Sequence, residues 1–518
     1  MTRSRHTLFP LAASTSRPDP TLPARRIAGT AARTACASIL GLASAASADV
    51  VEWNGKVDPV LWTEPDSWIG GAVPGPNDTA RFNSIGGSSS SLFPVDTLGV
   101  SVGALEFVGG SHSIRLSEQT IFTTTAASAQ MPSVTVGVDR PTFAELEGLG
   151  SSIVDHFFLG DVVVGLSAPG SLSFDSAAVD LRTLEIGRHA QGDVSLWGFG
   201  QPNTALDMDR LLIGTGAPGT NVFETGWLER IRVREMTIVG MSSFGTLRQL
   251  DPLELHDVVV GSDANSVGRA WVREPFSATG NVDVGLLGVG RIDLLVGGEI
   301  GGDLVVGVSS EGTGMPFETI GEGDVLLQSG ADLNVDGDVW IGFAGNGRIE
   351  LERSARLTTS GSISTGNIGV NDNRALVLHV RPGASDALPM VDAEGPASLP
   401  QVRLRFDPDA AGSIEPKAGD EWLLVQAESI AYEALTLPQL PGSLEWVVDD
   451  SMGRLVVRIV GTTSPADIDV DGDVDLVDLL IVLSEFGACA GPICPGDLNN
   501  DSVVDIVDLV RVLADWTG

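Results

Sequence analysis

The chain has 518 residues, and its 68 Asp and Glu residues against 31 Lys and Arg residues give a formal net charge of −37. A surface this acidic repels nucleic acid and anionic lipid and attracts cations, so nucleic acid is excluded as a partner. With 63 glycines and only 5% aromatic residues, this composition and length favour many short strands in a repeat array or several domains over a helical bundle.

Residues 1–48 have the pattern of a signal peptide. Arg25, Arg26 and Arg33 precede the mostly apolar stretch ACASILGLASAASA, which ends in the small-x-small pattern that a signal peptidase requires. Neither this short stretch nor any later one is long and apolar enough to cross a bilayer, so we expect no transmembrane span. Cleavage removes six arginines and one aspartate and leaves 25 basic and 67 acidic residues, a net charge of −42. We predict that the mature chain is secreted or displayed at the cell surface.

Residues 49–130 are predicted to form an N-terminal β cap and the first coils of a repeat array. Trp53, Trp62 and Trp68 lie among apolar strand residues, which favours buried positions over exposed platforms for sugar stacking. The segment VVEWNGKVDPVLWTEPDSWIGGAVPGPNDTARF, from Val50 to Phe82, resembles the opening of exported bacterial proteins with autotransporter-associated β repeats. Those proteins carry a similar W…W…VPG…D.A.F phrase.

Residues 131–370 carry a glycine that recurs after a valine or isoleucine, in phrases such as DVVVG, LLIG and VWIG. These glycines, 21 to 35 residues apart, are Gly165, Gly187, Gly214, Gly240, Gly261, Gly285, Gly307, Gly342 and Gly369. A β-branched residue before each glycine predicts a short strand that stops at a turn. Propeller blades and kelch repeats run to roughly 40 to 50 residues, whereas a period in the twenties fits one coil of a right-handed parallel β-helix. We predict a mainly β fold built on this β-solenoid, with a chain of β-sandwiches as the alternative.

Residues 371–460 are predicted to close the array as a C-terminal β cap, because the ends of a solenoid need protection. GDEWLLVQA and LPQLPGSLEWVVDDSMGRLVVRIV, between Gly419 and Val460, have the pattern of antiparallel strands. Within them, LPGSLEW resembles the end segment of the same class of exported repeat proteins.

Motifs for catalysis are weak in the predicted solenoid. GTGAPG after residue 213 matches a dinucleotide fingerprint, but its proline and the following TNVFETGW do not open the helix that such a site requires. Arg188, His189 and Asp193 in GRHAQGD are the best local candidates for acid–base chemistry, and a polar corner loop explains them equally well. We therefore assign no catalytic and no organic-cofactor residue from the sequence.

Residues 465–518 contain two windows crowded with carboxylates, DIDVDGDVDLVD and DLNNDSVVDIVD. Calcium takes about six to eight oxygen ligands, and a helix-flanked loop supplies them from positions 1, 3, 5, 7, 9 and 12. Those positions are Asp467, Asp469, Asp471, Asp473, Asp475 and Asp478 in the first window and Asp497, Asn499, Asp501, Val503 (through its carbonyl), Asp505 and Asp508 in the second. An empty loop with so many like charges opposes folding, and a divalent ion reverses that balance. We predict two Ca²⁺ sites, each followed by an apolar helix.

Cys489 and Cys494, in CAGPIC, are the two cysteines that remain after the predicted signal peptide is removed. Two thiols with no histidine nearby in the sequence cannot complete a tetrahedral zinc site. In an oxidising compartment we expect a disulfide between them, with a pair of free thiols as the alternative.

The two repeats, each a loop with one helix and with aspartate rather than glutamate at position 12, resemble a type I dockerin domain. The resemblance spans residues 465–518 and implies a small α module of paired EF-hand-like loops whose calcium ligands are those named above. It also implies a protein partner, because dockerins bind cohesin modules, often in assemblies that degrade plant polysaccharides. Where such domains usually carry Ser or Thr recognition residues, this chain has Leu476-Val477 and Ile506-Val507, which leaves the partner open between a cohesin and another module.

These patterns together predict an exported, non-catalytic β-helix scaffold, or a surface protein that binds glycans, with a calcium-dependent docking module. The alternative is a polysaccharide-degrading enzyme, a β-helix lyase or glycoside hydrolase, attached through the same module. The dockerin resemblance favours the enzyme, whereas the lack of a clustered acid pair in the sequence favours the scaffold. Convergence of Asp, Glu, Arg and His in one groove of the solenoid would favour the enzyme, and an even scatter would favour the scaffold.

Overall fold

The computed structural model describes residues 49–516 apart from 55–60, 84–90, 96–98, 117–119, 126–131, 149–154, 199–203, 227, 309–320, 343–344, 366–374, 383–387, 407–414, 442–443, 462–463, 470–473 and 490–493. The predicted signal peptide, Gly369 and the predicted ligands Asp471 and Asp473 lie outside the described residues. Of the described residues, 55% are in strands and 6% are in helices, so the fold is mainly β, as predicted.

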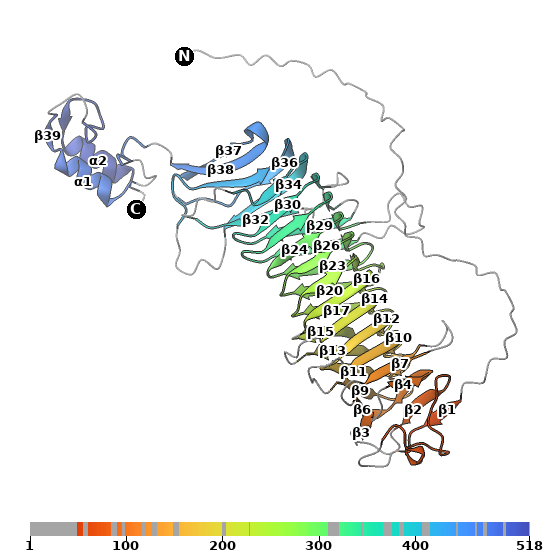
Figure 1. Ribbon diagram of the computed structural model, residues 1–518. Coiled ribbons are helices and arrows are strands. Elements are labelled where there is room, and N and C mark those ends of the chain that lie inside the picture. Colours follow the sequence, from red (N-terminus) through yellow and green to blue (C-terminus); the bar gives the residue numbers. More distant parts are fainter. Residues whose placement is uncertain are drawn as a thin grey trace, which may run out of the picture. The chain divides into compact units, whose positions relative to one another are not determined.

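A parallel β-solenoid of about 11 turns makes up most of the described chain (Figure 1). Its strands form three columns, and strands of successive turns pair in parallel within each column. The first column contains β1 (Val50–Glu52), β2 (Thr79–Asn83), β5 (Ala104–Val108), β8 (Val134–Val136), β10 (His156–Val164), β12 (Ala178–Ile186), β14 (Ala205–Ile213), β16 (Arg230–Val239), β19 (Asp257–Val260), β22 (Val282–Val284), β25 (Leu304–Val306), β28 (Val339–Ile341) and β31 (Ile363–Thr365).

The second column supplies the sheet face on which charged side chains gather near its C-terminal end. It contains β3 (Ser91–Val95), β6 (Gly110–Leu116), β9 (Thr142–Glu147), β11 (Gly170–Asp175), β13 (Gly192–Trp197), β15 (Thr220–Gly226), β17 (Phe244–Gln249), β20 (Val267–Val272), β23 (Val289–Leu294), β26 (Glu322–Leu327), β29 (Asn346–Leu351), β32 (Ala375–Val380) and β34 (Ala397–Phe406).

The third column contains β4 (Gly99–Val102), β7 (Ile121–Thr124), the first halves of β10, β12, β14 and β16, and then β18 (Leu253–Leu255), β21 (Phe276–Ala278), β24 (Gly297–Ile300), β27 (Asp332–Val335), β30 (Arg356–Thr359), β33 (Val391–Ala393) and β35 (Glu421–Gln426). Three parallel columns that share their turns are the arrangement of a solenoid and not of stacked β-sandwiches. The leading fold prediction is therefore confirmed at the level of a parallel β-solenoid.

The glycines of the predicted repeat lie at the corner where each turn leaves the first column. All of those that the structure describes, from Gly165 to Gly342, have φ between +65° and +80°. At Gly307, φ is +72°, and a Cβ atom would lie 2.0 Å from the carbonyl oxygen of Asn346 on the next turn. A side chain at this corner would meet both a disfavoured backbone conformation and the backbone of its neighbour, so the corner requires glycine.

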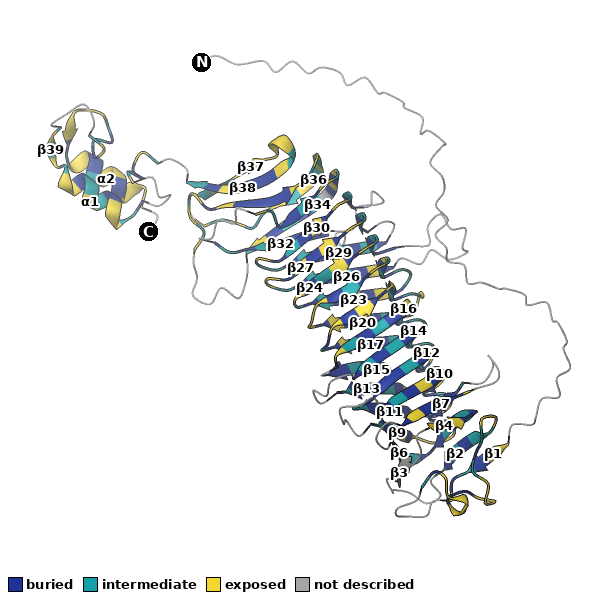
Figure 2. Ribbon diagram, viewed as in Figure 1, coloured by how far each residue is buried: buried dark blue, intermediate teal, exposed yellow. Residues whose placement is uncertain are grey.

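Alternating burial along the strands builds one apolar core through the solenoid (Figure 2). In β29, Ile349 and Leu351 are fully buried, whereas Arg348 and Glu350 on the opposite face are half-buried. Successive side chains of a strand point to opposite faces of the sheet, so equivalent residues of successive turns stack above one another inside. Burial of each such Val, Ile or Leu side chain contributes about 1.5–3 kcal/mol.

A ladder of polar side chains reinforces another corner of the solenoid. The side-chain oxygens of Asp257, Asn281, Asp303 and Asp338 each accept the backbone N–H of the equivalent residue on the next turn, at 3.0, 2.9, 2.9 and 2.8 Å. The last of these donors belongs to Ser362. Each bond satisfies a backbone N–H group at the corner that takes no part in the pairing between strands.

Three tryptophans close the N-terminal end of the core, as predicted. Trp53, Trp62 and Trp68 are 4%, 3% and 2% exposed. The ring centroids of Trp62 and Trp68 lie 5.0 Å apart in an edge-to-face contact, and the indole N–H of Trp68 donates to the carbonyl oxygen of Trp62 at 2.9 Å. The short 3₁₀-helix η1 (Pro65–Ser67) lies between these two residues. Burial excludes these rings as platforms for sugar stacking.

The C-terminal end of the solenoid switches from parallel to antiparallel pairing. β36 (Ile430–Thr436), which lies between the two segments predicted as antiparallel strands, still pairs in parallel with β34. β38 (Arg454–Gly461) pairs antiparallel with both β35 and β37 (Leu444–Asp449), and η2 (Ser451–Gly453) joins β37 to β38. Because β38 runs against the direction of the turns, it occupies an edge that another parallel turn would otherwise use.

The described residues from Ser464 to Trp516 form a separate small module. It contains α1 (Leu476–Ser484), β39 (Gly487–Ala488), β40 (Val503–Val504) and α2 (Ile506–Ala514). Its core consists of Ala466, Val474, Val482, Leu498, Val504 and Val512. Cys489 and Cys494 are joined by a disulfide, with their Cα atoms 5.8 Å apart, which confirms that expectation. Across the described chain, neither this module nor the rest contains a helix of the length and hydropathy that a membrane span requires.

Candidate metal centre

The first acidic window gathers three carboxylates at one point. Asp467, Asp469 and Asp478 each place a side-chain oxygen within 4.8 Å of the others. Asp478 is fully buried and Asp467 is 9% exposed. The structure therefore brings together positions 1, 3 and 12 of the predicted loop.

Asp478 holds the beginning and the end of this loop together. Its Oδ1 atom accepts the backbone N–H groups of Ile468 and Asp469 at 2.6 and 3.3 Å, and its Oδ2 atom accepts that of Asp475 at 2.8 Å. In return, the Asp475 side chain caps α1 by accepting the backbone N–H of Val477 at 2.7 Å. The capping box places positions 9 and 12 of the window on the first turn of the helix.

The second window repeats the same hydrogen bonds thirty residues later. Asp508 is fully buried, and its Oδ1 atom accepts from Leu498 at 2.9 Å and Asn499 at 3.2 Å, while Oδ2 accepts from Asp505 at 2.8 Å. Asp505 caps α2 through the backbone N–H of Val507 at 2.7 Å. Two independent stretches of sequence thus form one local structure, which chance acidic helix caps do not explain.

In the second window, side chains accept backbone N–H groups within the loop, but no three of its carboxylates, all of which the structure describes, gather within 4.8 Å as those of the first window do. Asp497 accepts the backbone N–H groups of Asp501 and Ser502 at 3.1 and 2.7 Å, and Asp501 accepts that of Val503 at 2.9 Å. Ser502 has φ of +72°, a conformation that favours glycine, and it occupies position 6 of the window. The loop therefore makes the sharp turn expected at position 6 without the glycine.

The donor set of the module fits a hard cation. Between residues 465 and 518 there are twelve acidic residues and one basic residue, Arg511, which gives a net charge of −11. Arg511 donates to the backbone carbonyl of Leu498 at 3.0 Å. Carboxylate and carbonyl oxygens suit Ca²⁺, whereas zinc and copper favour nitrogen and sulfur ligands. The described residues that could hold one cation are Asp467, Asp469, Asp475 and Asp478, and for a second they are Asp497, Asn499, Asp501, Val503, Asp505 and Asp508.

Both helices expose equivalent apolar side chains (Figure 2). Leu476 and Ile506 are 57% and 61% exposed, and Leu480 and Val510 are 53% and 54% exposed. The exposed apolar residues fall into pairs thirty positions apart: Leu476 and Ile506, Val477 and Val507, Leu480 and Val510, Leu483 and Leu513, and Phe486 and Trp516. We call these ten residues the paired apolar face. Exposed apolar residues on one small module are candidates for a contact surface.

The catalytic candidates of the sequence lie at a corner of the solenoid and on the strand that follows it. Arg188 pairs with Glu185, with 2.8 Å between Arg188 Nε and Glu185 Oε1, while His189 is exposed at the corner. Asp193 lies half-buried on β13, where burial raises the pKa of its carboxyl group. GTGAPG forms the corner between β14 and β15, so the strand that follows it excludes a dinucleotide fingerprint.

The sequence analysis missed a group of charged residues on β29, β32 and β34. There His379 Nε2 lies 2.6 Å from Glu350, and Arg348 and Arg405 flank the same carboxylate. Only the register between turns brings these residues together, because they are spread from residue 348 to residue 405.

Comparison with protein-family models, with curated proteins and with solved structures gives no match to this chain.

Proposed function

We propose that this chain is an exported, non-catalytic scaffold whose β-solenoid is attached to a protein partner through a calcium-ordered, dockerin-like helix pair. The observation that carries the proposal is the repetition in the C-terminal module. Asp478 and Asp508 make the same three backbone hydrogen bonds, and each of them opens a helix that exposes the same pattern of apolar residues. The hydrogen bonds of the loop and the exposed apolar residues of the helix are therefore repeated together.

Calcium is the cation that the loops fit best. The candidate ligands are all oxygen atoms, and Asp467, Asp469 and Asp478 each place one within 4.8 Å of the others. A cation at that point would offset the repulsion between the three carboxylates. A bound Ca²⁺ supplies positive charge that holds the start of each loop against its helix. The chain itself supplies the caps Asp475 and Asp505, which fix the helix N-termini to the loops.

The paired apolar face supports a protein partner rather than a soluble small molecule. Eight of its ten members are exposed on α1 and α2, and Phe486 and Trp516 follow those helices. Leu476-Val477 and Ile506-Val507 stand where dockerin-like domains usually carry hydroxyl residues, so this face favours an apolar surface on the partner. That partner is either a cohesin whose surface differs accordingly or another module.

The enzyme alternative needs an acid and a base that reach a substrate. On the described outer faces of the solenoid, arginines mostly pair with carboxylates of the same or a neighbouring turn, as in Arg232 with Glu254 at 2.7 Å. Basic and histidine side chains do converge around Glu350, but the hydrogen bond from His379 and the nearby Arg348 lower the pKa of this carboxyl group. A carboxylate held in its ionised form by these neighbours favours a structural role over a general acid. Export from the cell rests on the signal-peptide pattern alone.

Calcium titration of the mature chain, residues 49–518, tests the proposal. Isothermal titration calorimetry of the EDTA-stripped protein is expected to show two Ca²⁺ per chain, and Asp467→Asn combined with Asp497→Asn is expected to abolish both. Asp66→Asn changes an exposed carboxylate in η1 and is the matched control, with calcium binding unchanged. A stripped chain that binds no calcium would remove the metal from the proposal.

Docking is tested separately with the immobilised mature chain and extracts of the host envelope and medium. A partner retained in calcium and released by EGTA supports the proposal, provided that Leu480→Asp with Val510→Asp releases it while two Ca²⁺ still bind. If the double variant keeps the partner, the paired apolar face is not the docking surface. Release of reducing ends from a panel of polysaccharides by the wild-type chain would favour the enzyme instead.

A further inference from the structure

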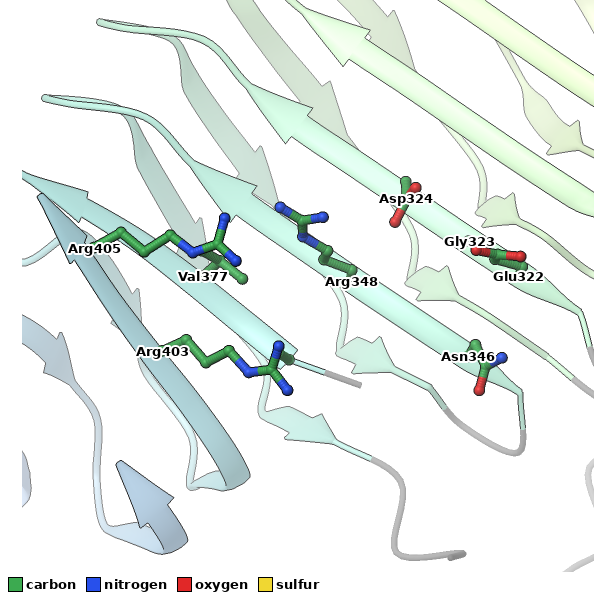
Figure 3. A pocket seen from close by; sticks show the side chains of 9 residues that line it. Glu322, Gly323, Asp324, Asn346, Arg348, Val377, Arg403 and Arg405 are labelled. Carbon is green, nitrogen blue, oxygen red and sulfur yellow. The ribbon is translucent and has the colours of Figure 1, made fainter. Parts of the chain in front are cut away.

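A cavity of about 130 Å³ opens on the outer face of the second column, across β26, β29, β32 and β34. Its lining residues are Glu322, Gly323, Asp324, Asn346, Arg348, Ala375, Val377, Arg403 and Arg405 (Figure 3). The cavity lies on the solenoid and shares no residue with the C-terminal module.

The cavity exists because one strand carries small outward residues between strands with long ones. Ala375 of β32 is aligned with Arg348 of β29, and Val377 is aligned with Arg403 of β34. Ala375 and Val377 are only 2% and 1% exposed, so they form the floor. Since neighbouring strands lie about 4.8 Å apart, β29 and β34 stand roughly 10 Å from each other with this floor between them.

Three arginines border this floor in a chain that is otherwise strongly acidic. Figure 3 shows the guanidinium ends of Arg348 and Arg405 directed toward each other, with Arg403 beside them. Arg405 approaches the nearest carboxylate, Glu350, at only 4.0 Å, and its side chain is 49% exposed. Glu350 already receives hydrogen bonds from His379 and Arg348, so the guanidinium group of Arg405 retains donors for an incoming anion.

The opposite side of the cavity offers acceptors instead of donors. Asn346 Oδ1 is buried there without a hydrogen-bond partner, and among the arginines the Nε–H donor of Arg348 is also without one. Asp324 contributes a carboxylate whose pKa is raised chiefly by burial. Buried polar atoms without partners are rare in folded proteins, so an acceptor and a donor left open in one cavity indicate a ligand with both kinds of group.

We propose that this cavity binds one residue of an acidic saccharide. Its anionic group lies against Arg348, Arg403 and Arg405, and its neighbouring hydroxyl groups donate to Asn346 and Asp324. A simple inorganic anion would satisfy the arginines and leave the acceptors unmatched. The guanidinium fork suits a planar carboxylate and also accepts a tetrahedral sulfate ester, so the ligand is either a uronic acid unit or a sulfated sugar unit.

Isothermal titration calorimetry of the mature chain with defined oligosaccharides tests the proposal. The probes are trigalacturonate for carboxylates, a κ-carrageenan oligosaccharide for sulfate esters and cellotriose as the neutral control. We expect binding of at least one acidic probe, no binding of cellotriose, and at least a tenfold loss of affinity in Arg403→Gln with Arg405→Gln. Arg405→Gln alone, at an exposed side chain, is expected to weaken binding without a change in the melting temperature.

Arg269→Gln is the matched control, because Arg269 lies on β20 in the same column and faces the ring of Phe244, outside the cavity. Its affinity for the acidic probes is expected to equal that of the wild type. Binding of trigalacturonate alone assigns the carboxylate, and binding of the carrageenan alone assigns the sulfate ester. The proposal is overturned if neither acidic probe binds, or if Arg269→Gln weakens binding as much as the cavity variants do.

Discussion

The solenoid and the C-terminal module use aspartate in opposite ways. In the solenoid, Asp303 and Asp338 are placed one above the other along a corner, and each accepts a backbone N–H from the next turn at 2.9 and 2.8 Å. In the module, Asp467, Asp469 and Asp478 place their oxygens within 4.8 Å of one another. The first arrangement is complete within the protein, whereas carboxylates gathered at one point repel one another until a cation joins them.

The difference extends to what else stabilises each region. One continuous apolar core runs through the solenoid, with fully buried side chains such as Phe107, Leu211 and Ile349. The module has a core of only six small or medium-sized side chains and one disulfide. A domain of this size rarely folds stably on so small a core without a metal or a cross-link. We therefore expect metal to decide the stability of the module and to leave the solenoid unchanged.

Removal of calcium is expected to have the largest effect. If Ca²⁺ orders both loops, EGTA removes about 4 kcal/mol of stability per site when calcium had been present at 1,000 times its dissociation constant. Hydrogen exchange with mass spectrometry is expected to show at least hundredfold faster exchange in α1 and α2, with exchange in β20 to β29 unchanged. Equal protection of α1 and α2 with and without EGTA would show that the module needs no metal.

Substitution of a corner glycine is expected to be the most damaging single change in the solenoid. At Gly307 a Cβ atom would lie 2.0 Å from the backbone oxygen of Asn346, so Gly307→Ala is expected to cost more than about 3 kcal/mol in urea unfolding. Gly330 has a similar φ of +80° but open space around it, so Gly330→Ala is expected to cost only about 1 kcal/mol. Equal losses at both positions would mean that the clash with the next turn does not matter.

The solenoid could be predicted from the sequence because its repeat is carried by single residues. A valine or isoleucine followed by glycine marks the end of a strand and a corner on every turn, and both properties depend only on local backbone geometry. Trp53, Trp62 and Trp68 were predicted to be buried for a similar reason, since their neighbours in the sequence are apolar strand residues. The spacing of acidic residues within each window predicts the loop positions of Asp478 and Asp508. Calcium binding at these loops is still a prediction.

The register between turns could not be predicted. Asp257, Asn281, Asp303 and Asp338 form one ladder although the spacing between them varies from 22 to 35 residues. The same uncertainty hid the alignment of Val377 with Arg403, which creates the arginine-lined cavity. Separation in the sequence indicates which residues lie close within one strand. Contact between turns also depends on the lengths of the loops between strands, which vary from turn to turn.

Substitution of one ladder aspartate is expected to have a moderate effect that calcium does not alter. Asp338→Ala removes the acceptor for the backbone N–H and the hydroxyl of Ser362, at 2.8 and 2.9 Å, and is expected to cost about 1–2 kcal/mol. Urea unfolding followed by tryptophan fluorescence, with calcium or with EGTA, measures this loss. Asp478→Ala is the counterpart in the module, and its effect is expected to be confined to α1, α2 and the calcium response. A calcium-dependent loss in Asp338→Ala would contradict the division between the two regions.

The smallest expected effect is a response of the solenoid to pH through Asp283 on β22. Burial, followed by the charges of Asp257 and Asp303, raises the pKa of this carboxyl group to about 6. The folded state therefore binds a proton more tightly than the unfolded state, and this group lowers the unfolding free energy as pH rises from about 4 to about 6. Asp283→Asn is expected to stabilise the solenoid by about 1 kcal/mol at pH 8, after allowance for partial exposure, and by nothing at pH 4. Urea unfolding at both pH values, with the exposed Asp332→Asn as control, measures the difference.

The module should respond in the opposite direction, because acid protonates metal ligands and weakens calcium binding. A variant equally stabilised at both pH values would show that the charge of Asp283 is not the cause.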